Sequence, residues 1–123
     1  MSLKRTALYD EHVKLKGRII DFGGWELPVQ YTGVIDEHMA CRTAAGLFDV
    51  SHMGEFWVEG KDAEDFLNYC VSNNLKNAKV NQAQYSALCN DGGGIVDDLI
   101  VYKFSTTKFL VVVNASNTDK DFS

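Results

Sequence analysis

The sequence has few of the features that mark specialised classes of protein. It contains one proline, three cysteines without a CxxC pair, and no apolar run near the roughly 20 residues that a membrane-spanning helix needs. The net charge of −5 does not favour a nucleic-acid or membrane partner. The polar start of the chain lacks the apolar segment of a signal peptide. We therefore expect a globular cytoplasmic protein whose cysteines are buried, reduced thiols.

Motifs for several common chemistries are also missing. There is no GxGxxG, no P-loop and no HExxH. His12, His38 and His52 do not have the spacing of metal ligands, so we expect no metal site. Ser51 and His52 are neighbours in sequence, but catalytic Ser–His pairs are defined by their positions in space.

The most informative stretch runs from residue 90 to residue 102. Residues 91–94 contain three glycines and predict a hairpin turn, and the β-branched, apolar run that follows predicts a strand. Because side chains alternate along a strand, Asp97 and Asp98 must lie on opposite faces. Whichever face is buried, one carboxylate is buried with it, and that carboxylate needs a hydrogen-bond partner or a ligand.

Hydrophobic spacing elsewhere predicts an α+β fold, in which short helices pack on an antiparallel sheet. We expect no domain boundary. The predicted elements are a helical turn within 3–15, helices at 33–45 and 61–71, a loop at 23–31, a connector at 72–82, and strands at 18–22, 47–50, 55–60, 85–89, 99–104 and 109–114.

Two hairpins then predict which side chains share a face. A three-residue turn at 105–107 pairs Phe104 with Lys108, which places Asp98 opposite Asn114. Tyr85 shares the face of Asp98 only if paired residue numbers across the glycine hairpin have an odd sum, and we predict the odd sum.

The end of the chain predicts the start of a helix, with Asn117 or Thr118 as its cap, that stops after about one turn. We therefore expect residues 1–123 to be the N-terminal portion of a longer protein. Apolar surface left exposed in such a portion favours self-association.

Five segments together resemble the aminomethyltransferase, or T-protein, of the glycine cleavage system. They follow that family's order and spacing and are KRTALY at 4–9, FGGWELP at 22–28, GLFDVSHMGE at 46–55, GGIVDDLIVY at 93–102 and VNASN at 113–117.

The resemblance implies a specific reaction. The enzyme transfers the methylene of an aminomethyl group, carried on the lipoyl arm of the H-protein, to tetrahydrofolate and releases ammonia. By the same match, Asp98 is the catalytic residue, holds the reactive end of the folate and is expected to point into a cavity. The other implied folate ligands are Met53, Tyr85, Tyr102 and Asn114.

Three alternatives stay open at this point. Relatives with the same folate-binding fold include demethylases of sarcosine- or dimethylglycine-like substrates and a non-enzymatic folate-binding protein of iron–sulfur assembly. The third alternative is a truncated α+β domain that binds nothing by itself.

Overall fold

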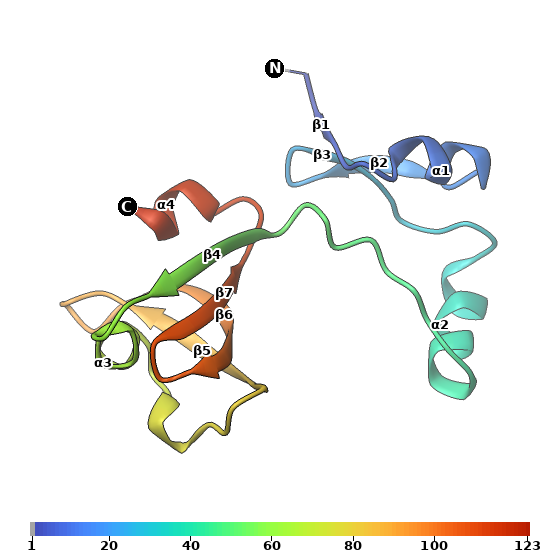
Figure 1. Ribbon diagram of the computed structural model, residues 1–123. Helices are drawn as coiled ribbons and strands as arrows, with labels where there is room; N and C mark the ends of the chain where they lie inside the picture. The colour runs from blue at the N-terminus through green and yellow to red at the C-terminus, as the bar shows by residue number, and fades with distance from the viewer. Residues whose placement is uncertain (1) are drawn as a thin grey trace. The chain divides into compact units, whose positions relative to one another are not determined.

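The computed structural model describes residues 2–123, and Met1 lies outside the described residues. The chain forms two compact units, one ending at His52 and one beginning at Met53 (Figure 1). The expectation of no internal boundary is therefore wrong. No helix in the described part of the chain is both long and apolar enough to cross a membrane.

Both units combine short helices with a small sheet, which confirms the predicted α+β class. The first unit contains β1 (Lys4–Arg5), α1 (Tyr9–Lys14), β2 (Ile19–Phe22), β3 (Trp25–Pro28) and α2 (Val34–Thr43). The second contains β4 (Gly54–Glu59), α3 (Ala63–Cys70), the 3-10 helix η1 (Leu75–Asn77), β5 (Gln82–Cys89), β6 (Ile95–Ser105), β7 (Lys108–Val113) and α4 (Thr118–Phe122).

The sheet of the first unit has the order β1-β3-β2. Gly23 and Gly24 have φ angles of 60° and 90°, so they form the two-residue turn of a hairpin that pairs Phe22 with Trp25. We predicted a loop over 23–31, and the structure shows that β3 occupies part of it. The proline is tolerated because Pro28 lies beyond the two residues of β3 that pair with β1, so no backbone donor is needed on that side.

Asp49 ties the beginning of the first unit to its end. The predicted strand at 47–50 is wrong, because this segment has no regular structure. The buried carboxylate of Asp49 instead accepts hydrogen bonds from Thr6 Oγ1 at 2.6 Å, His12 Nε2 at 2.8 Å and the Ser51 backbone N–H at 3.0 Å. Burial alone would raise the pKa of Asp49, but these hydrogen bonds outweigh it and hold the pKa well below its usual range.

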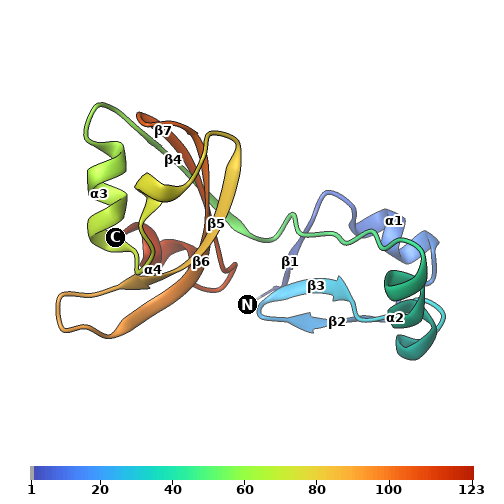
Figure 2. The same ribbon diagram turned by 90° about the horizontal axis from the view of Figure 1, so that it is seen from below.

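The sheet of the second unit is antiparallel with the order β4-β7-β6-β5. Figure 2 shows α3 running along one side of this sheet. The helix follows the predicted range, but only part of its predicted apolar stripe is buried, because Phe66 is 57% exposed. The core between α3, η1 and the sheet consists of Ala63, Leu67, Val71, Leu75, Leu99, Val101, Phe109, Val111 and Val113.

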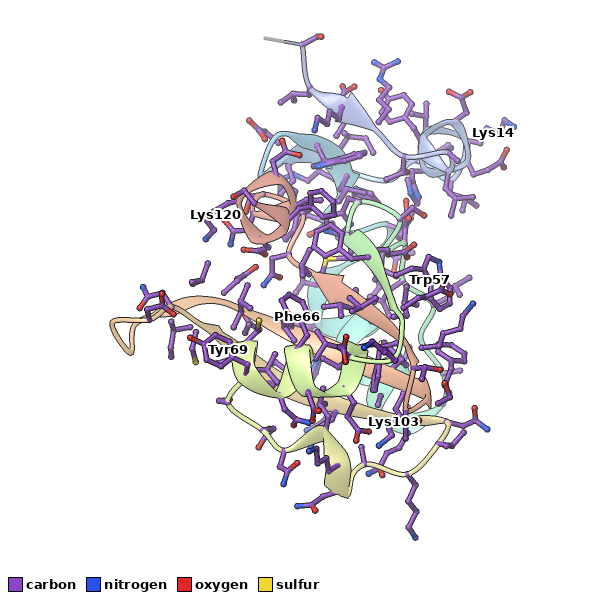
Figure 3. The ribbon with its side chains drawn as sticks, turned by 60° about the vertical axis from the view of Figure 1, so that its left-hand side comes forward. Lys14, Trp57, Phe66, Tyr69, Lys103 and Lys120 are labelled. Carbon is purple, nitrogen blue, oxygen red and sulfur yellow. The ribbon has the colours of Figure 1, made fainter. Side chains whose placement is uncertain are left out.

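A lysine also belongs to this core face. Lys103 lies on β6 and is only 5% exposed (Figure 3). Its ammonium group donates to Glu64 Oε2 at 2.6 Å and to the Leu75 carbonyl at 2.9 Å, so it links the sheet to α3 and η1. A buried ammonium is tolerated only with such partners.

The cysteines are free thiols, but they are not all buried. Cys41 is exposed, whereas Cys70 and Cys89 are partly buried.

We predict that the first unit loses stability in acid because of Asp49. Its pKa is depressed in the folded state, so its contribution is present above the unfolded-state pKa of about 4 and is lost as the pH falls below that value. Asp49→Asn should lower the free energy of unfolding by about 1–3 kcal/mol at pH 7 and by clearly less at pH 2, because the contribution is lost progressively as the pH falls toward the depressed folded-state pKa. Urea unfolding followed by fluorescence in a Trp57→Phe background reports on this unit, because Trp25 is then the sole tryptophan. An equal cost of the substitution at both pH values would contradict the prediction.

Candidate functional site

The two adjacent carboxylates of β6 lie on opposite faces of the sheet, as the alternation predicts. Asp97 faces the core and is 8% exposed, whereas Asp98 is exposed on the opposite, open face. We expected Asp98 to point into a cavity, but residues 2–123 leave this carboxylate accessible to solvent. The buried acid of the pair is Asp97.

Two side chains hold the Asp98 carboxylate, one at each oxygen. The Tyr85 hydroxyl donates to Oδ2 at 2.8 Å, and the Asn114 amide donates to Oδ1 at 3.0 Å. The same amide also lies 3.1 Å from the Asp98 carbonyl oxygen. These contacts fix the orientation of the carboxylate, and its remaining lone pairs face the open side of the sheet.

The contact with Tyr85 follows from the predicted register of the glycine hairpin. Tyr85 pairs with Ile100 and Ala87 pairs with Asp98, so the sums are odd. Next to the turn a register shift pairs Cys89 with Ile95. The predicted odd sum is therefore confirmed for the pairs from Gln82 to Leu88, but the pair next to the turn has an even sum.

The contact with Asn114 is reached by a different turn from the predicted one. Ser105 pairs with Lys108 across a two-residue turn, so the predicted pairing of Phe104 with Lys108 is wrong. A register shift between Lys103 and Ser105 then restores the predicted sum, and Leu99 pairs with Val113. Asp98 and Asn114, the next residues along, share the open face as predicted.

The other two predicted ligands lie near this cluster. Tyr102 follows Asp98 by four residues on the same strand face and is 38% exposed. Met53 is partly buried and directly precedes Gly54, which pairs with Val113 at the same end of the sheet. The sheet therefore brings Asp98, Tyr85 and Asn114 into direct contact and places Tyr102 and Met53 around them.

Apolar side chains form the rest of the open face. Ile100, Leu110 and Val112 are half-buried, and the rings of Trp57 and Phe104 lie 5.5 Å apart between centroids. An apolar floor beside a fixed carboxylate suits a flat ligand with N–H donors at one edge. In residues 2–123 no group of three or more His, Cys, Asp or Glu side chains is placed to hold a metal ion.

A second acid near the cluster was missed by the sequence reasoning. Asp121, on α4, lies next to Asp97 on the core face and raises the question of how two neighbouring acids are accommodated there. α4 begins at the predicted place, but Asn117 at its N-cap makes no side-chain cap, and Thr118 Oγ1 instead lies 3.2 Å from the Ala115 carbonyl. The inward orientation of Asp121 follows from the packing of α4 against the sheet and cannot be seen in the sequence around residue 121.

Residues 8–123 match the family described as the GCVT N-terminal domain. The chain belongs to this family. The match covers the first unit from Leu8 onward and all of the second unit, which includes Asp98, Tyr85 and Asn114.

Individual relatives agree with the family. The chain is 59% identical over 121 residues to an aminomethyltransferase of Desulfitobacterium hafniense and 54% identical over 121 residues to one of Staphylococcus carnosus. Its fold is similar to that of a crystal structure of glycine cleavage system aminomethyltransferase T from Bartonella henselae, with a TM-score of 0.91 and 42% identity.

Those comparisons cover 98% of this chain but a smaller share of each relative. The chain spans 33% of the length of the two curated relatives and 34% of the solved chain.

We predict that the phenol of Tyr85 titrates above its ordinary value. The hydrogen bond to Asp98 raises the pKa of Tyr85, because ionisation would remove the donor and place two negative charges together. Asp98→Asn should therefore lower the pKa of Tyr85 toward about 10, which NMR of the ring carbon that bears the hydroxyl measures directly.

A second Tyr–Asp pair in the same unit supplies the control. The Tyr69 hydroxyl donates to Asp91 Oδ1 at 3.2 Å, which also raises the pKa of Tyr69. Asp91→Asn should lower the pKa of Tyr69 and leave that of Tyr85 unchanged. If Asp98→Asn did not move the Tyr85 titration, the contact would be absent in solution.

Proposed function

We propose that this chain supplies the folate-holding carboxylate of a glycine cleavage aminomethyltransferase. The enzyme transfers the methylene of an aminomethyl group on the lipoyl arm of the H-protein to tetrahydrofolate and releases ammonia. Membership of the GCVT N-terminal domain family supports this proposal, and the names of the relatives favour it over the demethylase and iron–sulfur alternatives.

The observation that carries the proposal is the fixed carboxylate of Asp98. Tyr85 and Asn114 each use one lone-pair site of the carboxylate, so the remaining sites are free to accept from a ligand. The residues present therefore fit the N–H-rich edge of a reduced pterin. Ile100, Leu110 and Val112 would provide the adjoining apolar floor, and the Tyr102 ring on the same face would flank a flat ligand.

Tetrahydrofolate, when bound, supplies the nitrogens that take up the one-carbon unit. Asp98 would accept hydrogen bonds from the pterin and stabilise the positive charge that develops on the attacking amine nitrogen. A carboxylate already oriented by two hydrogen bonds does this without reorganising during the reaction. The Tyr85 hydroxyl is protonated at neutral pH and remains a donor to Asp98, and this contact raises its pKa further above the ordinary value.

We predict that Asp98→Asn reduces turnover more than it reduces folate binding. The test uses the Desulfitobacterium hafniense relative with its matching region replaced by this chain. Because the substituted amide keeps the shape but loses the charge, methylene transfer should fall about a hundredfold or more, with a smaller change in the dissociation constant for tetrahydrofolate.

Asp62→Asn is the matched control. It makes the same charge change at an exposed position. The Asp62 carboxylate has only a loose ion pair, with its Oδ2 atom 3.8 Å from Lys61 Nζ. This variant should retain normal transfer. Near-normal glycine cleavage by the Asp98→Asn protein would refute the role of Asp98.

A further inference from the structure

The core face of the second unit contains two carboxyl groups that the proposed chemistry does not use. Asp97 lies on β6 and Asp121 on α4, and the side chain of Asp121 is 0% exposed. Three of their four oxygens, Asp97 Oδ2 and both oxygens of Asp121, are buried without a hydrogen-bond partner among the described residues when both groups are ionised. Lys120 does not compensate, because its ammonium lies 3.9 Å from Asp121 Oδ1 and donates to the Val96 carbonyl at 2.8 Å.

The packing of α4 forces the two carboxyl groups together. A Cβ atom at Gly54 would lie 2.4 Å from Thr118 Oγ1, so α4 approaches β4 at a position where only glycine leaves room. At the other end of the helix, the Phe122 ring lies 5.3 Å from that of Phe56 between centroids. Figure 3 marks Lys120 on the same helix. With α4 held at both ends, the buried carboxyl group of Asp121 lies beside that of Asp97.

One shared proton would join two of these three oxygens in a hydrogen bond and remove one of the two buried negative charges. Two ionised carboxylates have no donor between them, whereas a protonated acid donates to its ionised neighbour. Burial and then the contact with Asp97 raise the pKa of Asp121 to about 6. Burial also opposes the charge on Asp97, but its hydrogen bonds, with Asp121 and Asn114 first among them, lower the pKa of Asp97.

We propose that Asp97 and Asp121 share one proton and that this protonated pair positions Asn114 against Asp98. Asn114 has two amide hydrogens and three acceptors within reach, namely Asp97 Oδ1 at 3.0 Å, Asp98 Oδ1 at 3.0 Å and the Asp98 carbonyl at 3.1 Å. Asp97 therefore holds from the core side the amide that orients Asp98 on the open side. This inference rests on the proposed function for the importance of Asp98, and it makes Asp97 a positioning residue.

The positioning should depend on pH. The shared proton is present at low pH and is lost as the pH rises through about 6. Above that value the two buried charges repel each other, so the packing of α4 against β4 weakens. The charged group beside the pair is Lys120 from α4, and Asp98 lies on the other face of β6, linked to the pair through the Asn114 amide. Gly54 and Phe56 of β4 and Val113 of β7, which line the same place, do not titrate.

Carbon NMR of the chain between pH 3 and pH 8.5, without folate, tests the proposal. The Asp121 carboxyl carbon should show an inflection near pH 6. The hydroxyl-bearing ring carbon of Tyr85, which senses Asp98, should show a second inflection at the same pH, which a merely structural pair would not produce.

Asp121→Asn supplies a permanent N–H donor in place of the shared proton. It should abolish the Tyr85 inflection and keep the Phe122–Phe56 contact, measured by nuclear Overhauser effects, at every pH. Asp97→Asn is a second variant with the same expected result. Asp119→Asn, which alters an exposed acid of the same helix, should leave both inflections in place.

Titration of Asp121 near pH 4, as for an isolated carboxyl group, would overturn the proposal. Persistence of the Tyr85 inflection in Asp121→Asn would do the same. Neither result bears on the folate reaction, so failure of this inference is separate from failure of the proposed function.

Discussion

The side chains of β6 alternate between the two faces of the sheet, and this alternation separates the adjacent carboxylates of Asp97 and Asp98. A single amide group, that of Asn114, reaches both of them. The face that carries Asp97 is closed by α3 and α4, and the face that carries Asp98 is open. The chemistry we assign to Asp98 therefore depends on packing on the other side of the sheet, because the same amide group contacts both acids.

The sequence predicted this cluster well because its geometry follows from strand periodicity. The positions of Asp98, Tyr85 and Asn114 depend only on which residues share a face of the sheet. A shift of the strand pairing near a turn does not change this when the pairing farther along the strands is the predicted one. The shift between Lys103 and Ser105 replaced the predicted three-residue turn without changing the pairing at Leu99. The Gly23-Gly24 pair before Trp25 is also typical of a hairpin turn. We nevertheless predicted a loop there, because the segment that follows contains Pro28, which is now seen to end β3.

Other features depended on contacts between distant residues and could not be predicted. Asp49 lies in an irregular segment because its carboxylate binds Thr6 and His12 rather than because of any local propensity. The inward orientation of Asp121 requires the close approach of Thr118 to Gly54. The exposure of Asp98 was also mispredicted, since the open face of the sheet is not covered within residues 2–123.

The most direct test of the account is a crystal structure of the Desulfitobacterium hafniense relative carrying this chain, with tetrahydrofolate bound. We predict a pterin N–H within hydrogen-bond distance of the Asp98 carboxylate, with Tyr85 and Asn114 still bound to its two oxygens. A pterin bound elsewhere, or an Asp98 side chain turned away from it with both of these contacts broken, would contradict the account.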